Sequence, residues 1–269
     1  MAAEMNLPNL PARLHRLWRQ FASGLCFVVF GVGAFLVGSL IIPVARFVTA
    51  GDERKQVVSR AIIRGGMRAF WRWMLLVRLF RCEIRGLEYL NGERILIVSN
   101  HPTLIDAVLL LGLVPDAVVV AKSTLAENPL TGPAVGAAGY IVNTDGGPSM
   151  VAEAARAFAR GGRVLVFPES TRTPPGEPIR LQRGAANIAV RTGCRVVVVT
   201  IRVSNPLLYK GAAWHQMPLE MPRFDVEVKP PFDVEEVLAA HESLALAARD
   251  LNDRLQQFYD AEIVVGGAT

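Results

Sequence analysis

The chain of 269 residues is poor in the residue types that build metal centres and disulfide frameworks. Its three cysteines, Cys26, Cys82 and Cys194, are scattered and lack C-x-x-C spacing. This pattern excludes a zinc ribbon and a disulfide framework, and it indicates buried, reduced thiols in a protein that faces a cytosol. The chain also has no G-x-S-x-G sequence, which disfavours an esterase or lipase with a nucleophile elbow.

Charge is missing from one long stretch near the start of the chain. Residues 21–43 contain no charged side chain, and a helix of that length would measure about 34 Å, enough to cross a hydrocarbon core of about 30 Å. We therefore expect a membrane helix there. A helix that only enters the bilayer remains open, and so does a cleaved signal peptide, although the apolar run is long for one and Arg46 precedes the candidate cleavage site around Ala50.

Positive charge is concentrated in the same third of the chain. Residues 1–90 carry 13 lysines and arginines against 5 acidic residues, whereas residues 91–269 carry 16 against 19. Within residues 57–81, arginines recur every fourth residue and form one stripe, which we expect to meet lipid phosphates at a membrane surface. The alternative is an ordinary amphipathic helix packed on the protein core. The stripe consists of Arg60, Arg64, Arg68 and Arg72.

These patterns predict the organisation of the chain. Residues 1–81 are expected to form two membrane-anchoring helices, and residues 82–269 an α/β domain. The flank that follows residue 43 is the richer in positive charge, so we expect the domain on the cytoplasmic side of an inner (cytoplasmic) membrane. The sequence has neither zinc-finger spacing nor interleaved basic and aromatic residues, so it does not indicate binding of nucleic acid. The expected partners are membrane lipids.

From residue 82 onward, short apolar runs rich in β-branched residues alternate with helical segments. This alternation predicts an α/β fold, a mostly parallel central sheet flanked by helices on both faces. The predicted strands are 82–84, 94–98, 117–121, 140–142, 164–167, 195–201 and 225–228. The predicted helices are 104–113, entered through Pro102, 129–138, 149–159 with Ser149 as N-cap, 184–191 and 234–259.

One polar stretch, S-N-H-P-T-L-I-D at residues 99–106, follows the second predicted strand. His101 precedes the expected helix, so its ring can fold back over the first turn and meet the Asp106 carboxylate. A carboxylate on one ring nitrogen fixes the tautomer and raises the basicity of the other, which makes His101 a candidate general base. A histidine that only caps the helix is the alternative. The pair His215 and Glu220 has the same spacing but no strand-to-helix bend, and we do not expect it to be functional.

A second polar cluster follows the predicted strand 164–167. It contains Glu169, Ser170, Thr171 and Arg172, and ligands of open α/β sheets bind beyond the carboxyl ends of the strands. Arg172 has the planar fork that suits a phosphate. A solvated loop held by an ion pair between Glu169 and Arg172 is the alternative.

Together the two stretches, N-H-x-x-x-x-D and F-P-E-x-T-R, resemble the motifs of the glycerolipid acyltransferase family, which includes the 1-acylglycerol-3-phosphate acyltransferases. The resemblance extends from about Ile84 to Val203. Lys122 stands at the spacing of the family's second block, and residues 196–201 are similar to its fourth, strand-like block.

The resemblance implies a membrane-bound O-acyltransferase. His101 would take the proton from a lysophospholipid hydroxyl while Asp106 orients the imidazole. The oxygen would then attack the thioester of acyl-CoA or acyl-ACP, with no covalent intermediate, no metal and no cofactor besides this co-substrate. The implied acceptor-binding residues are Lys122, Glu169, Ser170, Thr171, Arg172, Arg180 and Arg183.

Three positions depart from the family pattern. Thr124 stands where a glutamate is usual, Asp145 where an arginine helps to bind phosphate, and Ser170 where a glycine is usual. Asp145 would repel a phosphate monoester unless Arg180 or Arg183 compensates. Three alternatives therefore stay open: a non-standard acceptor such as an ornithine-type lyso-aminolipid, a non-standard acyl donor, and a catalytically inactive membrane protein that binds lipid.

Overall fold

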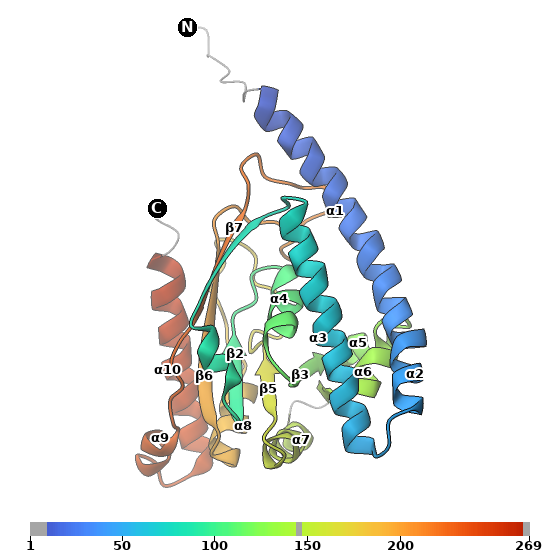
Figure 1. Ribbon diagram of the computed structural model, residues 1–269. Coiled ribbons are helices and arrows are strands. Elements are labelled where there is room, and N and C mark those ends of the chain that lie inside the picture. The colour runs from blue at the N-terminus through green and yellow to red at the C-terminus, as the bar shows by residue number, and fades with distance from the viewer. Residues whose placement is uncertain (1–9, 144–146, 266–269) are drawn as a thin grey trace, which may run out of the picture.

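The computed structural model describes residues 10–143 and 147–265. Seven strands form one sheet in the order β1-β7-β6-β2-β5-β3-β4 (Figure 1). All neighbouring strands are parallel except β6 and β7, so the predicted mostly parallel sheet is confirmed. The strands are β1 (Arg81–Arg85), β2 (Ile95–Ser99), β3 (Ala117–Lys122), β4 (Ile141–Asn143), β5 (Arg163–Val166), β6 (Arg195–Val203) and β7 (Arg223–Val228), each at a predicted position.

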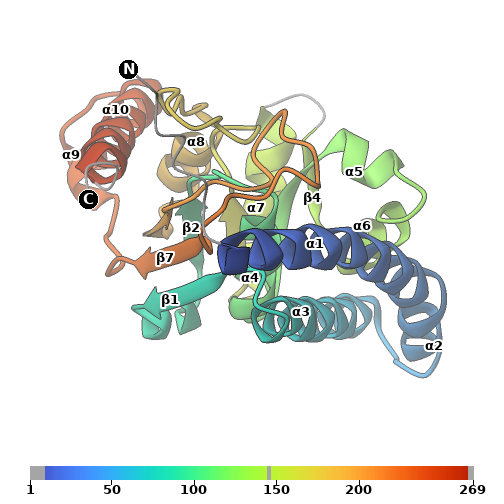
Figure 2. The same cartoon turned by 90° about the horizontal axis from the view of Figure 1, so that it is seen from above.

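The sheet is the middle layer of three. Every residue of β2 is buried, because alternate side chains enter two different apolar clusters. Ile97 packs toward α3 and α4, and Val98 packs toward α7, α8 and α10. Figure 2 shows α1 and α3 on one side of the sheet, with α8 and α10 on the other. The helices that follow β1 are α4 (Ile105–Leu113), α5 (Ser123–Glu127), α6 (Gly132–Ala138), α7 (Pro148–Ala159), α8 (Gly184–Thr192), α9 (Glu235–Ala239) and α10 (Leu244–Val265).

Several helix boundaries differ from the prediction. The segment 234–259 is two helices, because the Ser243 hydroxyl accepts the Leu246 N–H and starts α10 afresh as an N-cap. The helix α7 begins at Pro148, a residue favoured at the first helical position, so Ser149 is not its N-cap. Pro102 precedes α4 by three residues and lies in the loop. The short helix α5 was not predicted.

The N-terminal segment is one long helical stretch. It runs through α1 (Leu10–Leu36), a π-helical turn (Val37–Ile41) and α2 (Ile42–Phe47). By length and composition, Ala12–Phe47 could cross a membrane. The uncharged stretch 21–43 lies inside it.

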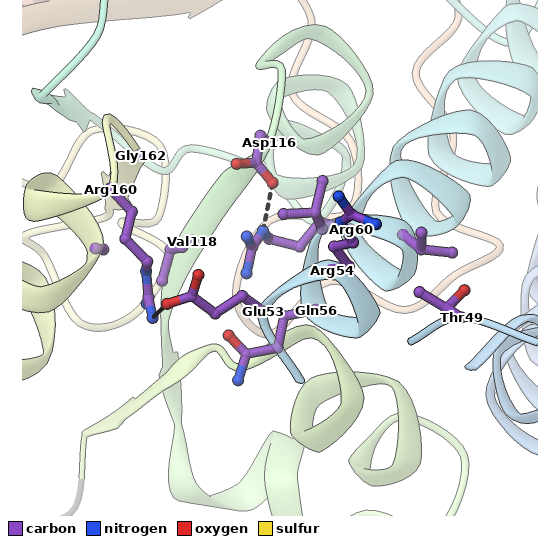
Figure 3. Close-up of a pocket in the computed structure, with 12 residues that line it drawn as sticks. Thr49, Glu53, Arg54, Gln56, Arg60, Asp116, Val118, Arg160 and Gly162 are labelled. Carbon is purple, nitrogen blue, oxygen red and sulfur yellow. Dashed lines mark hydrogen bonds and ion pairs between the residues drawn. The ribbon is translucent and has the colours of Figure 1, made fainter. Parts of the chain in front are cut away.

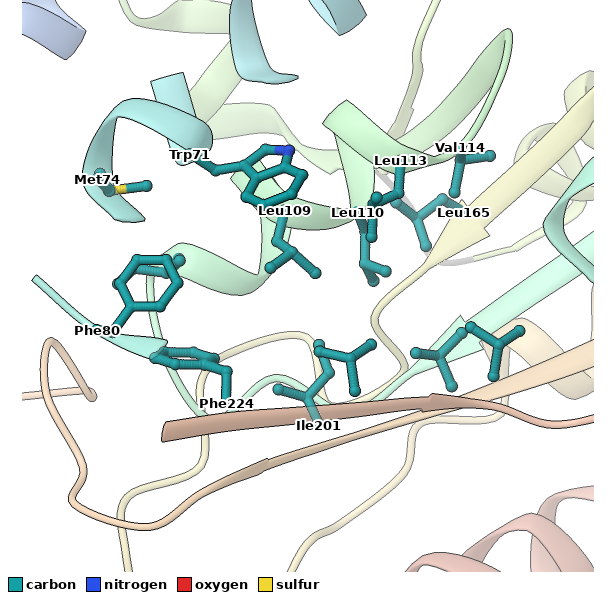
Figure 4. Close-up of a cluster of buried hydrophobic side chains, with 14 of the residues drawn as sticks. Trp71, Met74, Phe80, Leu109, Leu110, Leu113, Val114, Leu165, Ile201 and Phe224 are labelled. Atoms are coloured by element: carbon teal, nitrogen blue, oxygen red, sulfur yellow. The ribbon is translucent and has the colours of Figure 1, made fainter. Parts of the chain in front are cut away.

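The next helix, α3 (Asp52–Leu76), packs directly on the domain. Trp71 and Met74 enter the same apolar cluster as α4 and the sheet (Figure 4). Arg60 pairs with Asp116, and Arg64 donates to the carbonyl of Leu113 at the end of α4. These two members of the predicted stripe therefore face protein, as in the packed-helix alternative, whereas Arg72 is exposed.

The connection between β6 and β7 reaches α1. We call residues 204–222 the strap, which Figure 1 shows in orange beside α1. Arg19 donates to the carbonyls of Pro218 and Leu219, and the Ser23 hydroxyl donates to the carbonyl of Trp214. The long apolar helix is thus fastened to a loop of the α/β domain.

Candidate active site

The two polar stretches meet at one edge of the sheet. β2 ends at Ser99 and β5 ends at Val166, and the two strands are parallel neighbours. Their carboxyl ends therefore release the following loops side by side. The backbone N–H of His101 donates to Glu169 Oε1 at 2.6 Å, which ties the first stretch to the second.

His101 faces Asp106 as predicted from their spacing. Nδ1 of His101 lies 3.1 Å from Oδ2 of Asp106. The carboxylate is fully buried and also accepts the backbone N–H of Thr103 at 2.6 Å and its hydroxyl at 2.7 Å. These contacts fix the carboxylate before any substrate binds. The contact at Nδ1 leaves Nε2 as the nitrogen that can receive a proton.

Glu169 contacts the loop between β2 and α4, residues 100–104, which we call the catalytic loop because it carries the candidate base His101. Its second carboxylate oxygen accepts the Thr173 hydroxyl, and the backbone N–H of Thr173 donates to the carbonyl of His101. Burial raises the pKa of Glu169 above its ordinary value. The hydrogen bonds that Glu169 accepts from the Thr173 hydroxyl and the His101 N–H oppose that shift. Both oxygens are occupied within the protein, so Glu169 braces the loop.

Further residues that the sequence did not single out hold the same loop. Asn100 exchanges two hydrogen bonds with the backbone of Ile201 in β6, at 2.7 and 2.8 Å. The Phe167 ring lies 4.4 Å from the His101 ring. The hydroxyl of Tyr259, on α10, donates to the carbonyl of Val98. Asn100 and Phe167 stand inside the two motifs, whereas nothing in the sequence around Tyr259 indicates its contact.

A cleft of about 270 Å³ opens beside the catalytic loop. Three cationic side chains line it, Arg172, Arg180 and Lys210, together with Thr171 and the Glu169 already described. Arg172 also donates through Nη1 to the carbonyl of Leu208 at 2.8 Å. Lys210 belongs to the strap, about 40 residues beyond the second motif, which is why the sequence motifs did not indicate it.

Other predicted acceptor-binding residues lie outside this cleft. Lys122 ends β3, two strands away from β2 in the sheet order. Arg183 stands at the start of α8. Ser170 has a φ of 58°, the left-handed region that favours glycine, which agrees with the glycine expected there. Asp145 lies outside the described residues. His215 belongs to the strap and offers its carbonyl to Gln20.

A larger cavity, about 360 Å³, lies at the opposite edge of the sheet. Figure 3 shows Glu53 and Arg160 meeting across it, with the Arg60–Asp116 pair alongside. The arginines Arg160 and Arg60 already have carboxylate partners, at 3.5 Å and 2.6 Å respectively. This cavity is separate from the His101–Asp106 pair.

Comparisons with known proteins agree with this arrangement. Residues 81–204 match the family model described as Acyltransferase. This part of the chain is therefore similar to an acyltransferase domain. Over 196 residues it is 26% identical to the chloroplastic 1-acyl-sn-glycerol-3-phosphate acyltransferase BAT2 of Brassica napus, covering 70% of this chain and 56% of that protein. Over 143 residues it is 27% identical to the 1-acyl-sn-glycerol-3-phosphate acyltransferase of Pseudomonas aeruginosa, covering 51% of this chain and 55% of that one.

The α/β domain and the helices before it also resemble a solved structure. The 1-acyl-sn-glycerophosphate acyltransferase PlsC of Thermotoga maritima superposes with a TM-score of 0.66 at 19% identity, over 93% of this chain and 97% of that one. At this identity the match shows the fold. The chain spans about half the length of the curated relatives it matches.

Proposed function

We propose that this protein is a membrane-bound O-acyltransferase that moves an acyl chain from acyl-CoA or acyl-ACP to the hydroxyl of a lysophospholipid. The observation that carries the proposal is the His101–Asp106 pair. Its Nδ1 contact at 3.1 Å and the buried, hydrogen-bonded carboxylate together form a preorganised general base. The names of the curated relatives favour the same chemistry.

In the proposed reaction, Nε2 of His101 takes the proton of the acceptor hydroxyl as its oxygen attacks the thioester carbonyl. Asp106 stabilises the imidazolium that forms. The tetrahedral intermediate then collapses, the carbon–sulfur bond breaks, and the thiolate leaves and receives the proton from His101. Backbone N–H groups of the neighbouring loops would stabilise the oxyanion. The step needs neither a metal ion nor a covalent acyl-enzyme.

The acceptor headgroup is proposed to occupy the cleft beside the catalytic loop. The lining side chains Arg172 and Arg180 carry positive charge, which favours a phosphate-bearing lysolipid such as lysophosphatidic acid. An ornithine-type lyso-aminolipid remains the second acceptor to test, because Asp145 replaces the arginine that the family pattern would place there.

The N-terminal helical stretch is proposed to hold the enzyme on the membrane. Fifteen large apolar side chains on it are exposed, among them Phe21 and Phe47, and a contiguous apolar surface of this kind marks a membrane or a partner. The excess of positive charge after residue 43 supports the proposal that the domain lies on the cytoplasmic side of the inner membrane.

The test measures thiol release from acyl-CoA and acyl-ACP by the purified protein, with a panel of lysolipids and with His101→Ala alongside. General-base assistance typically contributes about 10²–10⁴-fold, so the variant should lose at least about a hundredfold in rate with whichever acceptor is used. The panel contains lysophosphatidic acid, other lysophospholipids and a lyso-ornithine lipid.

Equal rates for wild type and His101→Ala would contradict the mechanism. Silence of the wild type with every donor and acceptor would favour an inactive lipid-binding protein, and vesicle flotation with the same lipids would then show whether binding persists in the variant. If the enzyme clearly prefers the lyso-ornithine lipid, that lipid and not lysophosphatidic acid would be the acceptor.

A further inference from the structure

One cationic side chain that lines the cleft beside the catalytic loop, Lys210, belongs to neither motif. Lys210 comes from the strap and lines the cleft with Arg172 and Arg180. We infer that Lys210 is a specificity-determining residue that binds the anionic headgroup of the acceptor, and that α1 sets its position through the strap. The inference rests on the proposed function and deepens it.

The charges in the cleft favour an anionic ligand. Three cationic side chains line it, against the carboxylates of Glu169 and Glu177. Both carboxylate oxygens of Glu169 already accept hydrogen bonds within the protein, from the His101 N–H and the Thr173 hydroxyl. Lys210 is exposed, so its ammonium group is free to follow a phosphate.

The strap is pinned to the catalytic loop two residues before Lys210. The carbonyl of Leu208 accepts Nη1 of Arg172 at 2.8 Å and the backbone N–H of Leu104 at 3.1 Å. Leu104 lies between His101 and Asp106 in the chain. Leu208 itself is buried and has a φ of 51°, an unfavourable value for leucine that these contacts hold in place. The backbone leading to Lys210 is therefore fixed relative to the general base.

The other end of the strap is pinned to α1. Arg19 is only 3% exposed and donates to the carbonyls of Pro218 and Leu219, at 2.7 and 2.6 Å. The Trp214 ring lies against Gly24, where a Cβ would come within 2.9 Å of it. One connected path therefore runs from the apolar helix through the strap to the headgroup cleft. Arg19 is a positioning residue in this arrangement.

The first experiment compares Lys210→Ala and Lys210→Arg with the wild type. Two acceptors that share an acyl chain are used, lysophosphatidic acid and the uncharged monoacylglycerol. Loss of one charged contact should raise KM for lysophosphatidic acid about tenfold, with kcat within about twofold, and should leave monoacylglycerol unaffected. Lys210→Arg should restore the KM. Arg249→Ala, which removes an exposed cation on α10, is the matched control.

The second experiment tests the path from α1. Arg19→Met should raise KM for lysophosphatidic acid severalfold without a matching loss of kcat. Ser23→Ala removes another hydrogen bond between α1 and the strap and should have a smaller effect. A double-mutant cycle with Lys210→Ala should be strongly non-additive, because a displaced strap no longer matters once Lys210 is gone. Additive effects would overturn the role given to Arg19.

Direct binding keeps this test separate from that of the proposed function. Equilibrium binding of lysophosphatidic acid and of monoacylglycerol is measured for wild type and Lys210→Ala, whether or not turnover occurs. Weaker binding of lysophosphatidic acid alone supports the inference. Identical affinities, or an equal loss for both lipids, would overturn it even if the wild type proves to be an active acyltransferase.

Discussion

Glu169 has a different environment from the one its motif predicts. The motif places it on the acceptor, whereas the structure buries it under the catalytic loop, with one oxygen on His101 N–H and the other on the Thr173 hydroxyl. A carboxylate in this position stabilises the loop through charge-assisted hydrogen bonds. Ionisation in a buried site is costly, and so the pKa of Glu169 is raised.

The raised pKa predicts how stability depends on pH. The folded protein holds the Glu169 proton more tightly than the unfolded chain, so this contribution is complete below the ordinary pKa near 4.5 and is lost as pH rises through the folded value. Glu169→Gln stays neutral, so its Tm relative to wild type should rise as the pH is raised above about 4.5. A tenfold difference in proton affinity between folded and unfolded protein corresponds to about 1.4 kcal/mol, or roughly 3–6 °C in Tm.

Thermal unfolding across this pH range provides the measurement. Glu177→Gln, an exposed glutamate in the same cleft, is the matched control and should follow the wild-type profile. Parallel Tm profiles for Glu169→Gln and wild type would contradict the raised pKa.

At the scale of secondary-structure elements, the contact between α3 and α4 depends on one glycine. A Cβ on Gly112 would lie 2.8 Å from Nε1 of Trp71 and 3.0 Å from the backbone nitrogen of Arg68. The two helices approach this closely only because position 112 lacks a side chain. The contact joins the N-terminal third of the chain to the domain that carries the candidate active site.

Gly112→Ala should therefore destabilise the protein by about 1–3 kcal/mol, since the backbone of α3 cannot move without disturbing the core. The matched control is Gly66→Ala on α3, where nothing lies within 4 Å of an added Cβ. This exposed helical site should gain about 0.5–1 kcal/mol from the substitution. Thermal unfolding of both variants provides the measurement. Equal changes in Tm for Gly112→Ala and Gly66→Ala would contradict a close approach of the helices.

At the scale of the whole molecule, exposed apolar side chains are concentrated on the N-terminal stretch. Phe21 and Val28 are 64% and 61% exposed and lie seven residues apart, on one face of α1. Leu244 and Leu246, at the start of α10, are also exposed, but their helix covers the other face of the sheet (Figure 2). Phe21 and Val28 thus differ from Leu244 and Leu246 chiefly in the helix that carries them, which makes the second pair a control for the first.

The double substitution Phe21→Glu with Val28→Glu should release the protein from vesicles that contain anionic lipid. Two carboxylates on the apolar face oppose burial in hydrocarbon, at about 2.5–3.5 kcal/mol for an acidic residue at the centre of a spanning helix. Leu244→Glu with Leu246→Glu should leave flotation unchanged. Equal flotation of the two double variants would contradict membrane attachment through α1.

The sequence alone was enough to predict all seven strands and the contact between His101 and Asp106. Short β-branched runs report burial on both faces of a sheet, and the positions of His101 and Asp106 on either side of a strand-to-helix bend follow from local geometry. Residues close in sequence are constrained by the backbone, so such a pair can be predicted without knowledge of the fold. The expectation that ligands gather beyond the carboxyl ends of β2 and β5 followed in the same way.

Only the tertiary structure decided which distant residues join that site and which leave it. Lys210, Tyr259 and Arg19 come from segments remote in the chain, and the sequence around them resembles that of ordinary surface or core positions. The arginine stripe of α3 showed the same limit: its spacing fixed one face of a helix, but whether that face met lipid or protein depended on the position of α4. Periodicity determines the face, and long-range packing determines its partner.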